Sequence, residues 1–479
     1  DATVDELVIE RVLPVVGADS IITNDTTPQL TGTVDDAAAV VTVTVNTIAY
    51  TATNNGDGTW TLADDTILAG DALPDGTYDV GVSAIDIYGN VGVDAAVDVL
   101  VLETTAHALL MSTDGAAAGS PGLPSWGDSE AVSFQNPNLA FDPTTGTTDG
   151  NFSSVFYIEN CSGTTTKIEA IHYVRSDMTA GTNNFQLFNG DMLISLDSDE
   201  TLTSTNSLLV SRADVFVFRP DTPGDYSSGT FLMFVDGSDV GIGRMTGFAL
   251  VEQATTVGGV VLNAGDFLYT DNNNDIEHFQ PGTYGDTTSG ADTIFIDGSD
   301  IGINAGPGGT KFTAIALVEQ DMAIGDQVLI SGQLLLSISK ELGSVGDNGI
   351  ATDRQDSFIL DVTTAGANTA ADATLLFDGS DVALAENSES INALALFNKG
   401  PAVTVDSLIT NDTRPQLTGT VDDAAAVVTV TVNSIAYTAT NNGDGTWTLA
   451  DDTILAIDAL ADGTYDVAVT AVDILGNID

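Results

Sequence analysis

Residues 94–103 read DAAVDVLVLE, and residues 1–10 read DATVDELVIE. Residues 94–103 follow Gly89-Asn90 and end a β-rich module that begins near Pro14. Because the two stretches are near-copies, we predict that residues 1–10 are a closing strand of the same kind, without a module of their own. The apolar residues that this strand would place in an interface are Val4, Leu7, Val8 and Ile9.

The module itself occurs twice. Residues 23–90 and 410–477 match almost residue for residue, which marks a true internal repeat. Within the first copy, residues 41–45 (VTVTV) alternate with period two as a strand does, and residues 54–58 (NNGDG) predict a hairpin turn. Short strands between turn signals, without a helical period, favour a β-sandwich. The second copy stops at Asp479, where its closing strand should start.

Three motifs of this module resemble bacterial Ig-like repeats of giant surface adhesins. They are NDTTPQLTGTV at residues 24–34, NGDGTW at residues 55–60 and DGTYDV at residues 75–80. The resemblance implies an Ig-like β-sandwich over residues 11–105 and a second one, lacking its last strand, over residues 401–479. It also implies extracellular spacers that calcium stiffens at their junctions, where the candidate ligands are Glu10 and Glu103.

Residues 106–400 carry a second, unrelated repeat. Its marker is an Asp-Gly-Ser-Asp turn, and each turn is followed by an apolar strand. Two further strands lie upstream of each turn, one rich in leucine and one led by an aspartate. Four copies of four strands predict a four-bladed β-propeller, with a stacked β-solenoid as the alternative. The turns occupy residues 234–241, 295–302 and 377–382, and the leading aspartates are Asp128 (in a degenerate first copy), Asp214, Asp275 and Asp356.

These turns are candidate calcium sites, because two carboxylates and a hydroxyl in one tight turn present hard oxygen ligands to one point. A plain β-turn, in which Asp starts the turn and Gly supplies a positive φ, explains the same residues without an ion. The leading aspartates would form a ring of like charges, so either a cation lies among them or they bond backbone amides. The residues predicted to bind Ca²⁺ are Asp236, Asp239, Asp297, Asp300, Asp378, Asp381 and Asp275.

The chain is strongly acidic, with 11 Lys and Arg against 69 Asp and Glu and a net charge of -58. This balance excludes nucleic acid as a default partner, because phosphate binding needs clustered cations. Many carboxylates need counterions, so a saline or calcium-rich exterior and a secreted, cell-surface protein fit best. No window approaches the ~18 consecutive apolar residues of a membrane span, so membrane insertion is not predicted. The single cysteine, Cys161, cannot form an intrachain disulfide.

Catalysis finds little support in the sequence. The three histidines, His107, His172 and His278, lie in different segments, and none has the spacing of a nucleophile and its base or of a metal site. Pairs of carboxylates that mimic a glycosidase site arise by chance in so acidic a chain. We therefore predict that the protein is not an enzyme and has no catalytic residues.

The leading functional hypothesis is an extracellular structural filament whose subunits polymerise head to tail. Residues 1–10 of one chain would complete the sandwich of residues 401–479 in the next chain by donor-strand complementation. A sandwich without its last strand exposes an unpaired edge, which is an aggregation liability unless a strand fills it. Two alternatives stay open. The chain is one period of a giant calcium-dependent surface adhesin, or the propeller is a glycan-binding head carried on Ig-like stalks.

Overall fold

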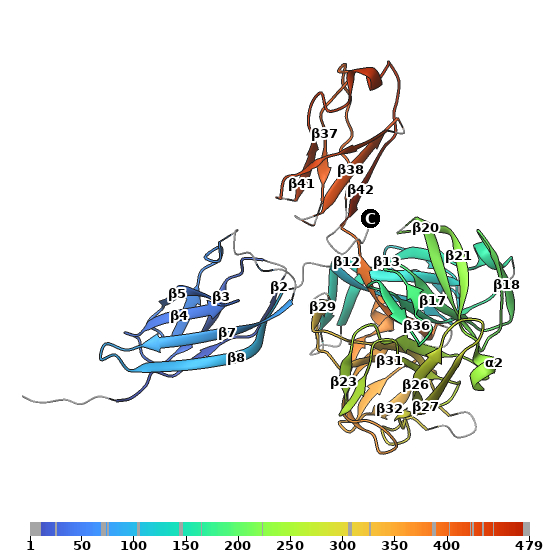
Figure 1. Cartoon of the computed structure of the whole chain (residues 1–479), viewed down its shortest axis with the longest axis horizontal. Helices are drawn as coiled ribbons and strands as arrows, with labels where there is room; N and C mark the ends of the chain where they lie inside the picture. Colours follow the sequence, from blue (N-terminus) through green and yellow to red (C-terminus); the bar gives the residue numbers. More distant parts are fainter. Residues whose placement is uncertain are drawn as a thin grey trace, which may run out of the picture. The chain divides into compact units, whose positions relative to one another are not determined.

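The computed structural model describes residues 11–472 except 24–25, 69–72, 74–75, 103–105, 143–146, 164, 223, 305–308, 325–326, 386–388, 402, 422, 424–425, 434 and 444. Regular structure in the described residues is almost entirely β, with a few short helical turns (Figure 1). No helix among them is long and apolar enough to cross a membrane. Outside the described residues lie the predicted interface residues Val4, Leu7, Val8 and Ile9 and the predicted junction ligands Glu10 and Glu103.

The first repeat module folds as a β-sandwich with strand order β1-β3-β6-β5-β4-β7-β8-β2. β5 joins the two faces, since its start pairs with β4 and its end pairs with β6. Residues 94–102 of the predicted strand lie in β8, between antiparallel β7 and parallel β2. The strands are β1 (Val16–Ala18), β2 (Ile21–Thr23), β3 (Leu30–Val34), β4 (Val40–Val45), β5 (Ile48–Asn54), β6 (Thr59–Leu62), β7 (Gly76–Ile85) and β8 (Val91–Leu102).

The core of this sandwich includes the closing strand. Trp60 is fully buried, and its Nε1 donates to the carbonyl oxygen of Gly17 at 2.9 Å. Leu100 and Leu102 of β8 are 0% and 1% exposed and pack in the same cluster. Burying an aliphatic side chain of this size contributes about 1.5–3 kcal/mol. β8 is therefore part of the core and not a strand added to its outside.

The second repeat module has the same arrangement as far as it is described. One sheet has the order β37-β41-β40 and the other the order β39-β38-β42. Trp447 takes the place of Trp60, and its Nε1 donates to the carbonyl oxygen of Thr404 at 2.8 Å. The elements are β37 (Leu417–Thr420), β38 (Val427–Val432), β39 (Ile435–Thr438), β40 (Thr440–Asn441), β41 (Thr446–Leu449), η3 (Ala456–Asp458) and β42 (Val467–Val472).

The repeat block, residues 106–400, contains four four-stranded sheets. The first is β36 (Ile391–Lys399), β9 (Ala106–Thr113), β12 (Glu130–Asp142) and β13 (Thr147–Tyr157). The second is β14 (Ile168–Tyr173), β17 (Met192–Leu196), β20 (Val215–Thr222) and β21 (Asp225–Val235). The third is β22 (Gly247–Leu250), β25 (Phe267–Thr270), β26 (Ile276–Thr283) and β27 (Ser289–Ile296). The fourth is β28 (Phe312–Leu317), β31 (Leu334–Ile338), β34 (Ser357–Thr364) and β35 (Ala370–Phe377).

Short hairpins and helical turns connect these strands. The hairpins pair β10 (Ala117–Ala118) with β11 (Ser125–Trp126), β15 (Met178–Ala180) with β16 (Phe185–Leu187), β18 (Glu200–Thr203) with β19 (Ser207–Val210), β23 (Thr255–Val257) with β24 (Val260–Leu262), β29 (Met322–Ile324) with β30 (Gln327–Leu329), and β32 (Leu342–Val345) with β33 (Ile350–Thr352). The helical turns are α1 (Glu159–Ser162), α2 (Gly237–Val240) and η2 (Gly379–Val382).

The first strand of each sheet is an inner strand, and the four inner strands form a cycle of contacts. β36 contacts β14, β14 contacts β22, β22 contacts β28, and β28 contacts β36. Hydrogen bonds between β36 and β9 join the last strand of the block to the first one. The four sheets therefore form a nearly closed arrangement around their inner strands.

The sheets are displaced by one strand from the repeat seen in the sequence. The apolar strand after each Asp-Gly-Ser-Asp turn does not pair with the strands that precede the turn. It becomes the inner strand of the next sheet, so that β22 follows the turn at residues 236–239 and pairs with β25. Each sheet thus combines strands from two successive sequence repeats, because the last strand of one repeat is the inner strand of the next sheet.

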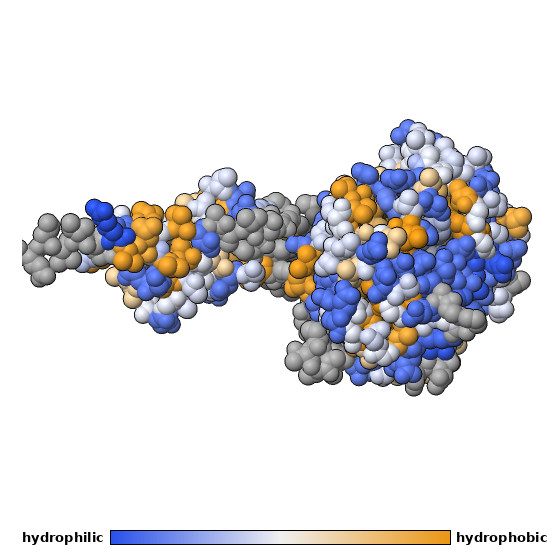
Figure 2. Space-filling view, turned by 90° about the horizontal axis from the view of Figure 1, so that it is seen from below, coloured by the Kyte–Doolittle hydropathy of each residue, from blue (hydrophilic) through white to orange (hydrophobic). Residues whose placement is uncertain are grey.

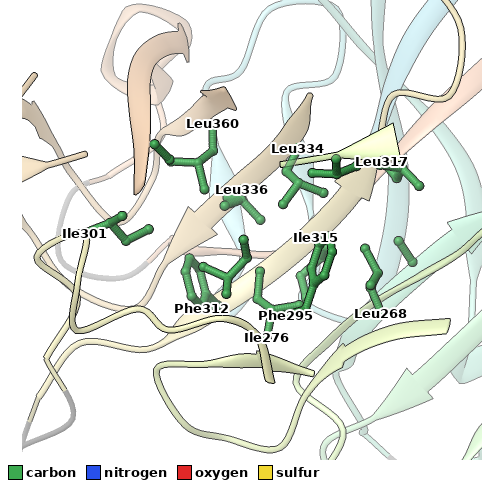
Figure 3. Packing of buried hydrophobic residues seen from close by; sticks show 14 of the residues in the cluster. Leu268, Ile276, Phe295, Ile301, Phe312, Ile315, Leu317, Leu334, Leu336 and Leu360 are labelled. Atoms are coloured by element: carbon green, nitrogen blue, oxygen red, sulfur yellow. The ribbon is translucent and has the colours of Figure 1, made fainter. Parts of the chain in front are cut away.

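Apolar side chains fill the space between neighbouring sheets. Figure 3 shows Leu268 and Phe295 of the third sheet facing Ile315 and Leu336 of the fourth. All four side chains are at most 1% exposed. On the surface, hydrophilic residues form a broad band over the repeat block in the view of Figure 2, with hydrophobic residues in smaller patches. This distribution fits a soluble chain with a large net charge.

The Asp-Gly-Ser-Asp turns bind one sheet to the next. Asp236 caps α2 by accepting from Ser238 N at 3.1 Å, and its own amide donates to Thr288 Oγ1 at 2.9 Å. Asp239 Oδ2 in turn accepts from the backbone amide of Thr288 at 2.9 Å. The same reciprocal contact joins Asp297 and Asp300 to Thr369, and Asp378 and Asp381 to Thr148. The repeated motif therefore holds three of the four joints between sheets.

The glycine of each turn lies against backbone. A Cβ on Gly379 would lie 2.3 Å from the carbonyl oxygen of Gln355, and Gly237 and Gly298 are as tightly enclosed. From the sequence we expect glycine here because the turn needs a positive φ. In the structure glycine is needed instead because two chain segments approach too closely to leave room for a side chain.

We predict that Gly379→Ala lowers the free energy of unfolding by about 1–3 kcal/mol, because an added methyl group must displace backbone. Gly343→Ala is the matched control, since its Cβ would meet no atom within 4 Å, and it should change stability by less than about 0.5 kcal/mol. Thermal or denaturant unfolding of the two variants measures the difference. Equal stability of both would contradict the role assigned to this glycine.

Candidate functional site

The second sandwich contains a groove of about 740 Å³ at the edge of β42. Two segments form its walls, residues 405–413 and residues 460–467. Leu408 and Ile409 belong to the first wall and are 51% and 102% exposed. Exposed aliphatic residues beside an unpaired strand edge are characteristic of a site that another chain segment covers.

The first sandwich shows what fills the corresponding position. In the first sandwich, β2 and the start of β7 correspond to the two walls of the groove, and β8 lies between them. Ile21 pairs with Leu100 on one side, and Tyr78 pairs with Leu100 on the other. In the second sandwich, no strand pairs with the free edge of β42 within the described residues, which end at Val472. The groove therefore lies at the place that corresponds to β8 in the first sandwich.

The segments that flank the groove contain less strand than their counterparts in the first sandwich. β7 begins at Gly76, whereas β42 begins at Val467, which is the counterpart of Val80. Residues 408–410, the counterparts of β2, form no strand. In the first sandwich both segments pair with β8.

Side-chain burial follows the same pattern. Val80 and Val82 are each 2% exposed in the first sandwich, but their counterparts Val467 and Val469 are only half-buried. By contrast, Ala84 and its counterpart Ala471 are both completely buried. An apolar strand in the groove would complete the burial of these valines and form a backbone ladder with β42.

The leading acids of the repeat block bond backbone amides. Asp214, Asp275 and Asp356 each accept through Oδ1, at 3.1 Å, from the amide of the glycine in the following Asp-Gly-Ser-Asp turn. Asp214 Oδ2 also accepts from Ser211 N at 2.7 Å, and Asp356 Oδ2 accepts from Asp353 N at 2.8 Å. Of the two roles considered for these carboxylates, the structure shows the amide-bonding one.

In the first repeat copy the leading acid is Glu130, so the assignment of Asp128 is wrong. Glu130 Oε2 accepts from Gly127 N at 3.3 Å, which corresponds to the bond between Asp214 and Ser211. Asp128 instead forms an ion pair with Lys167 at 3.3 Å. The distance to the following strand could have identified the residue, because Glu130, like Asp214, directly precedes an apolar run.

The structure shows the contacts of the candidate calcium ligands in the three turns. Asp236, Asp297 and Asp378 cap their own turns, and Asp239, Asp300 and Asp381 reach the next sheet. Within the described ranges, no three His, Cys, Asp or Glu side chains lie close enough to hold a metal ion together. Calcium binding at these turns, and at Glu10 and Glu103, stays a prediction from the sequence.

The structure also brings together a buried charged cluster that the sequence did not indicate. Arg175 contacts Glu252 and Glu319 at 3.5 and 2.5 Å, and His172 Nε2 lies 3.2 Å from Glu252. These side chains extend from three inner strands and the residues that follow them. Burial raises the pKa of the Glu319 carboxyl. Because Arg175 bridges two buried carboxylates, the cluster ties the second, third and fourth sheets together at one end of the inner strands.

Comparison with known proteins identifies the two sandwiches. Residues 16–101 and 397–479 match the family model of bacterial Ig-like domains, which confirms the prediction of Ig-like modules. No curated protein matches the chain.

Two solved structures are similar to the chain over most of its length. One is a tetra-tandem repeat in the extending region of a large adhesion protein, with 17% identity, a TM-score of 0.18 and 97% of each chain covered. The other is described as part of a 1.5-MDa bacterial ice-binding adhesin retained on the host cell surface, with 12% identity, a TM-score of 0.16, and 98% of this chain and 96% of that chain covered. Such TM-scores do not establish a shared overall fold.

We predict that the repeat block becomes more stable as the pH falls from 7 towards 4. Burial raises the pKa of the Asp356 carboxyl to about 6, and it also raises the pKa of Asp214 and Asp275. An unfolded aspartate has a pKa of about 3.9, so between that pH and the raised pKa the native protein binds more protons than the unfolded chain. The stabilisation that comes from this difference is present at low pH and is lost as the pH rises through the raised pKa of the folded protein. Unfolding measured across this range should show a weaker pH dependence for Asp356→Asn than for the wild type.

Proposed function

We propose that this protein is a non-enzymatic, extracellular surface protein of the adhesin-repeat type, and that its second Ig-like sandwich is completed by a strand with the sequence of residues 1–10. In the leading form of the proposal that strand comes from another copy of the chain, which builds a head-to-tail filament. The observation that carries it is the groove beside β42, where the first sandwich holds β8.

Because residues 1–10 are a near-copy of part of β8, the pairing of β8 predicts which residues of the two strands would lie side by side. Leu7 and Ile9 correspond to Leu100 and Leu102, which are fully buried in the first sandwich. Transferred to the second sandwich, this register sets Leu7 beside Leu408 on one wall and beside Tyr465 on the other. Each of the two aliphatic side chains would contribute about 1.5–3 kcal/mol on full burial. A head-to-tail contact of this kind builds an open fibre when the rotation between successive subunits does not close into a ring.

We also propose that the repeat block is a four-bladed β-propeller. The cyclic contacts of β36, β14, β22 and β28 support this, as does the pairing of the last strand, β36, with the first, β9. In such an arrangement each four-stranded sheet is one blade, and radial repetition leaves only short, protected strand edges.

The second candidate is one period of a giant calcium-dependent surface adhesin. In that case the closing strand would be supplied by the following stretch of the same polypeptide. The same groove supports both candidates, because they differ only in the covalent connection of the strand. The match of both sandwiches to bacterial Ig-like domains is compatible with either.

The strand proposal predicts a specific disulfide between two chains. Leu7→Cys and Leu408→Cys chains, mixed and mildly oxidised, should form a covalent dimer, because paired residues of adjacent strands lie within the ~7 Å that a disulfide spans. Non-reducing gel electrophoresis and mass spectrometry of the linked peptide measure it.

Thr3→Cys is the matched control for this experiment. Thr3 lies four residues from Leu7, or about 13 Å along a strand, so it should not link to Leu408→Cys. No link with Leu7→Cys, or equal linking with both variants, would contradict the proposed register. Failure of the wild-type chain to form filaments, with the link present, would instead reject only the polymer.

The mass of the native polypeptide separates the two candidates. Under denaturing conditions a filament subunit should have a mass close to the 49.3 kDa of this chain. A single polypeptide several times heavier would support the adhesin and contradict the filament.

A further inference from the structure

The repeat block has a polar pocket at the end where its inner strands begin. The pocket has a volume of about 800 Å³, within the range of small-molecule sites in proteins. Residues at the starts of all four inner strands line it, including Thr246 before β22, Thr313 in β28 and Asn392 in β36. It lies wholly within the repeat block and is unrelated to the groove in the second sandwich.

The charge of this pocket is opposite to that of the chain. Four of the 11 cationic side chains line it, namely Lys167, Arg244, Lys311 and Lys340. Only three of the 69 acidic residues do so, namely Asp114, Glu169 and Asp197. Four positive and three negative charges give the lining a formal charge of +1, whereas the whole chain carries -58.

Three of these cations lie just before an inner strand, so the repeat brings them to the same end of the block. Lys167 and Lys311 directly precede the inner strands β14 and β28, and Arg244 lies three residues before β22. The carbonyl oxygens of Lys167 and Lys311 accept equivalent bonds, from Asp197 N and Ser339 N. Three of the four repeats therefore each deliver a basic side chain to the same opening.

Two of the three carboxylates are already neutralised. Arg244 pairs with Glu169 at 2.5 Å, and Asp114 pairs at 3.3 Å with Arg354. Lys311 differs from Lys167 and Arg244, because its Nζ donates at 2.8 Å to the uncharged amide oxygen of Asn272, and it has no ion pair within the described residues. A positive charge that faces an amide in a pocket is available to an anionic ligand.

The neutral side chains around these cations favour a ligand rich in hydroxyl groups. Asn272, Asn392, Thr246, Thr313 and Ser339 all line the pocket and offer both donors and acceptors. We infer that this pocket binds an acidic sugar residue, with its carboxylate or sulfate on Lys311 and the neighbouring cations and its hydroxyls on the amide and hydroxyl side chains. This gives the glycan-binding alternative a defined site, and it does not depend on the closing-strand proposal.

A long polyanion such as nucleic acid is a poorer ligand for this pocket. Neutralisation of a phosphate backbone needs cations spread along a surface, whereas here they converge on one opening in a strongly negative chain. A single charged sugar residue needs only the local cations, because the negative charges beyond about 8–10 Å are screened at physiological salt.

Calorimetric titration of the full chain with a galacturonic acid trisaccharide tests the inference. The matched probe is the fully methyl-esterified trisaccharide, which keeps the sugar and removes the charge. We expect the acidic trisaccharide to bind and the ester to bind at least about tenfold more weakly, since a charge-assisted hydrogen bond contributes about 1.5–3 kcal/mol. A sulfated disaccharide in a parallel titration distinguishes a preference for sulfate from one for carboxylate.

Lys311→Gln should weaken binding of the preferred acidic probe by about tenfold or more, with unchanged thermal unfolding. The control is Arg11→Gln, which removes the same charge from an exposed residue outside the repeat block and should leave the affinity unchanged. The inference is overturned if no acidic sugar binds or if the methyl ester binds equally well. It is also overturned if inorganic sulfate binds as tightly as the sugars, or if Lys311→Gln binds like the wild type.

Discussion

The antiparallel ladder between β36 and β9 is the interaction on which the repeat block depends. β36 is the last strand of the block and β9 the first, so their hydrogen bonds join its two ends. Once β36 occupies the inner position of the first sheet, every other apolar strand must also move forward by one sheet. The four inner strands then begin at the same end, where the basic pocket lies, and β14, β22 and β28 end near the cluster around Arg175.

The two sandwiches differ at the position of one strand, β8. In the first sandwich β8 supplies Leu100 and Leu102 to the core and holds β2 and the start of β7 in extended form. In the second, the same walls surround a groove, and Val467 and Val469 are only half-buried. In the first sandwich β8 therefore contributes both a backbone ladder and two core side chains.

The acidity of the chain is used differently inside the molecule and on its surface. Inside, a few cations hold buried carboxylates, as Arg175 does with Glu252 and Glu319. In the turns, aspartates accept from backbone amides, because a short carboxylate can reach nearby N–H groups. Asp236, Asp297 and Asp378 therefore have a structural role as caps of their own turns. The motif that suggested calcium serves as a contact between sheets.

By itself the sequence determined the all-β class, the two Ig-like modules and the closing character of residues 94–103, because period-two alternation and turn residues act over a few neighbours. It also located the turns at Asp236, Asp297 and Asp378. Only the tertiary structure decided which sheet each apolar strand joins, that Glu130 and not Asp128 leads the first repeat, and that Lys167, Arg244 and Lys311 converge. Those facts depend on contacts between residues tens to hundreds of positions apart, and local sequence patterns carry no information about such partners.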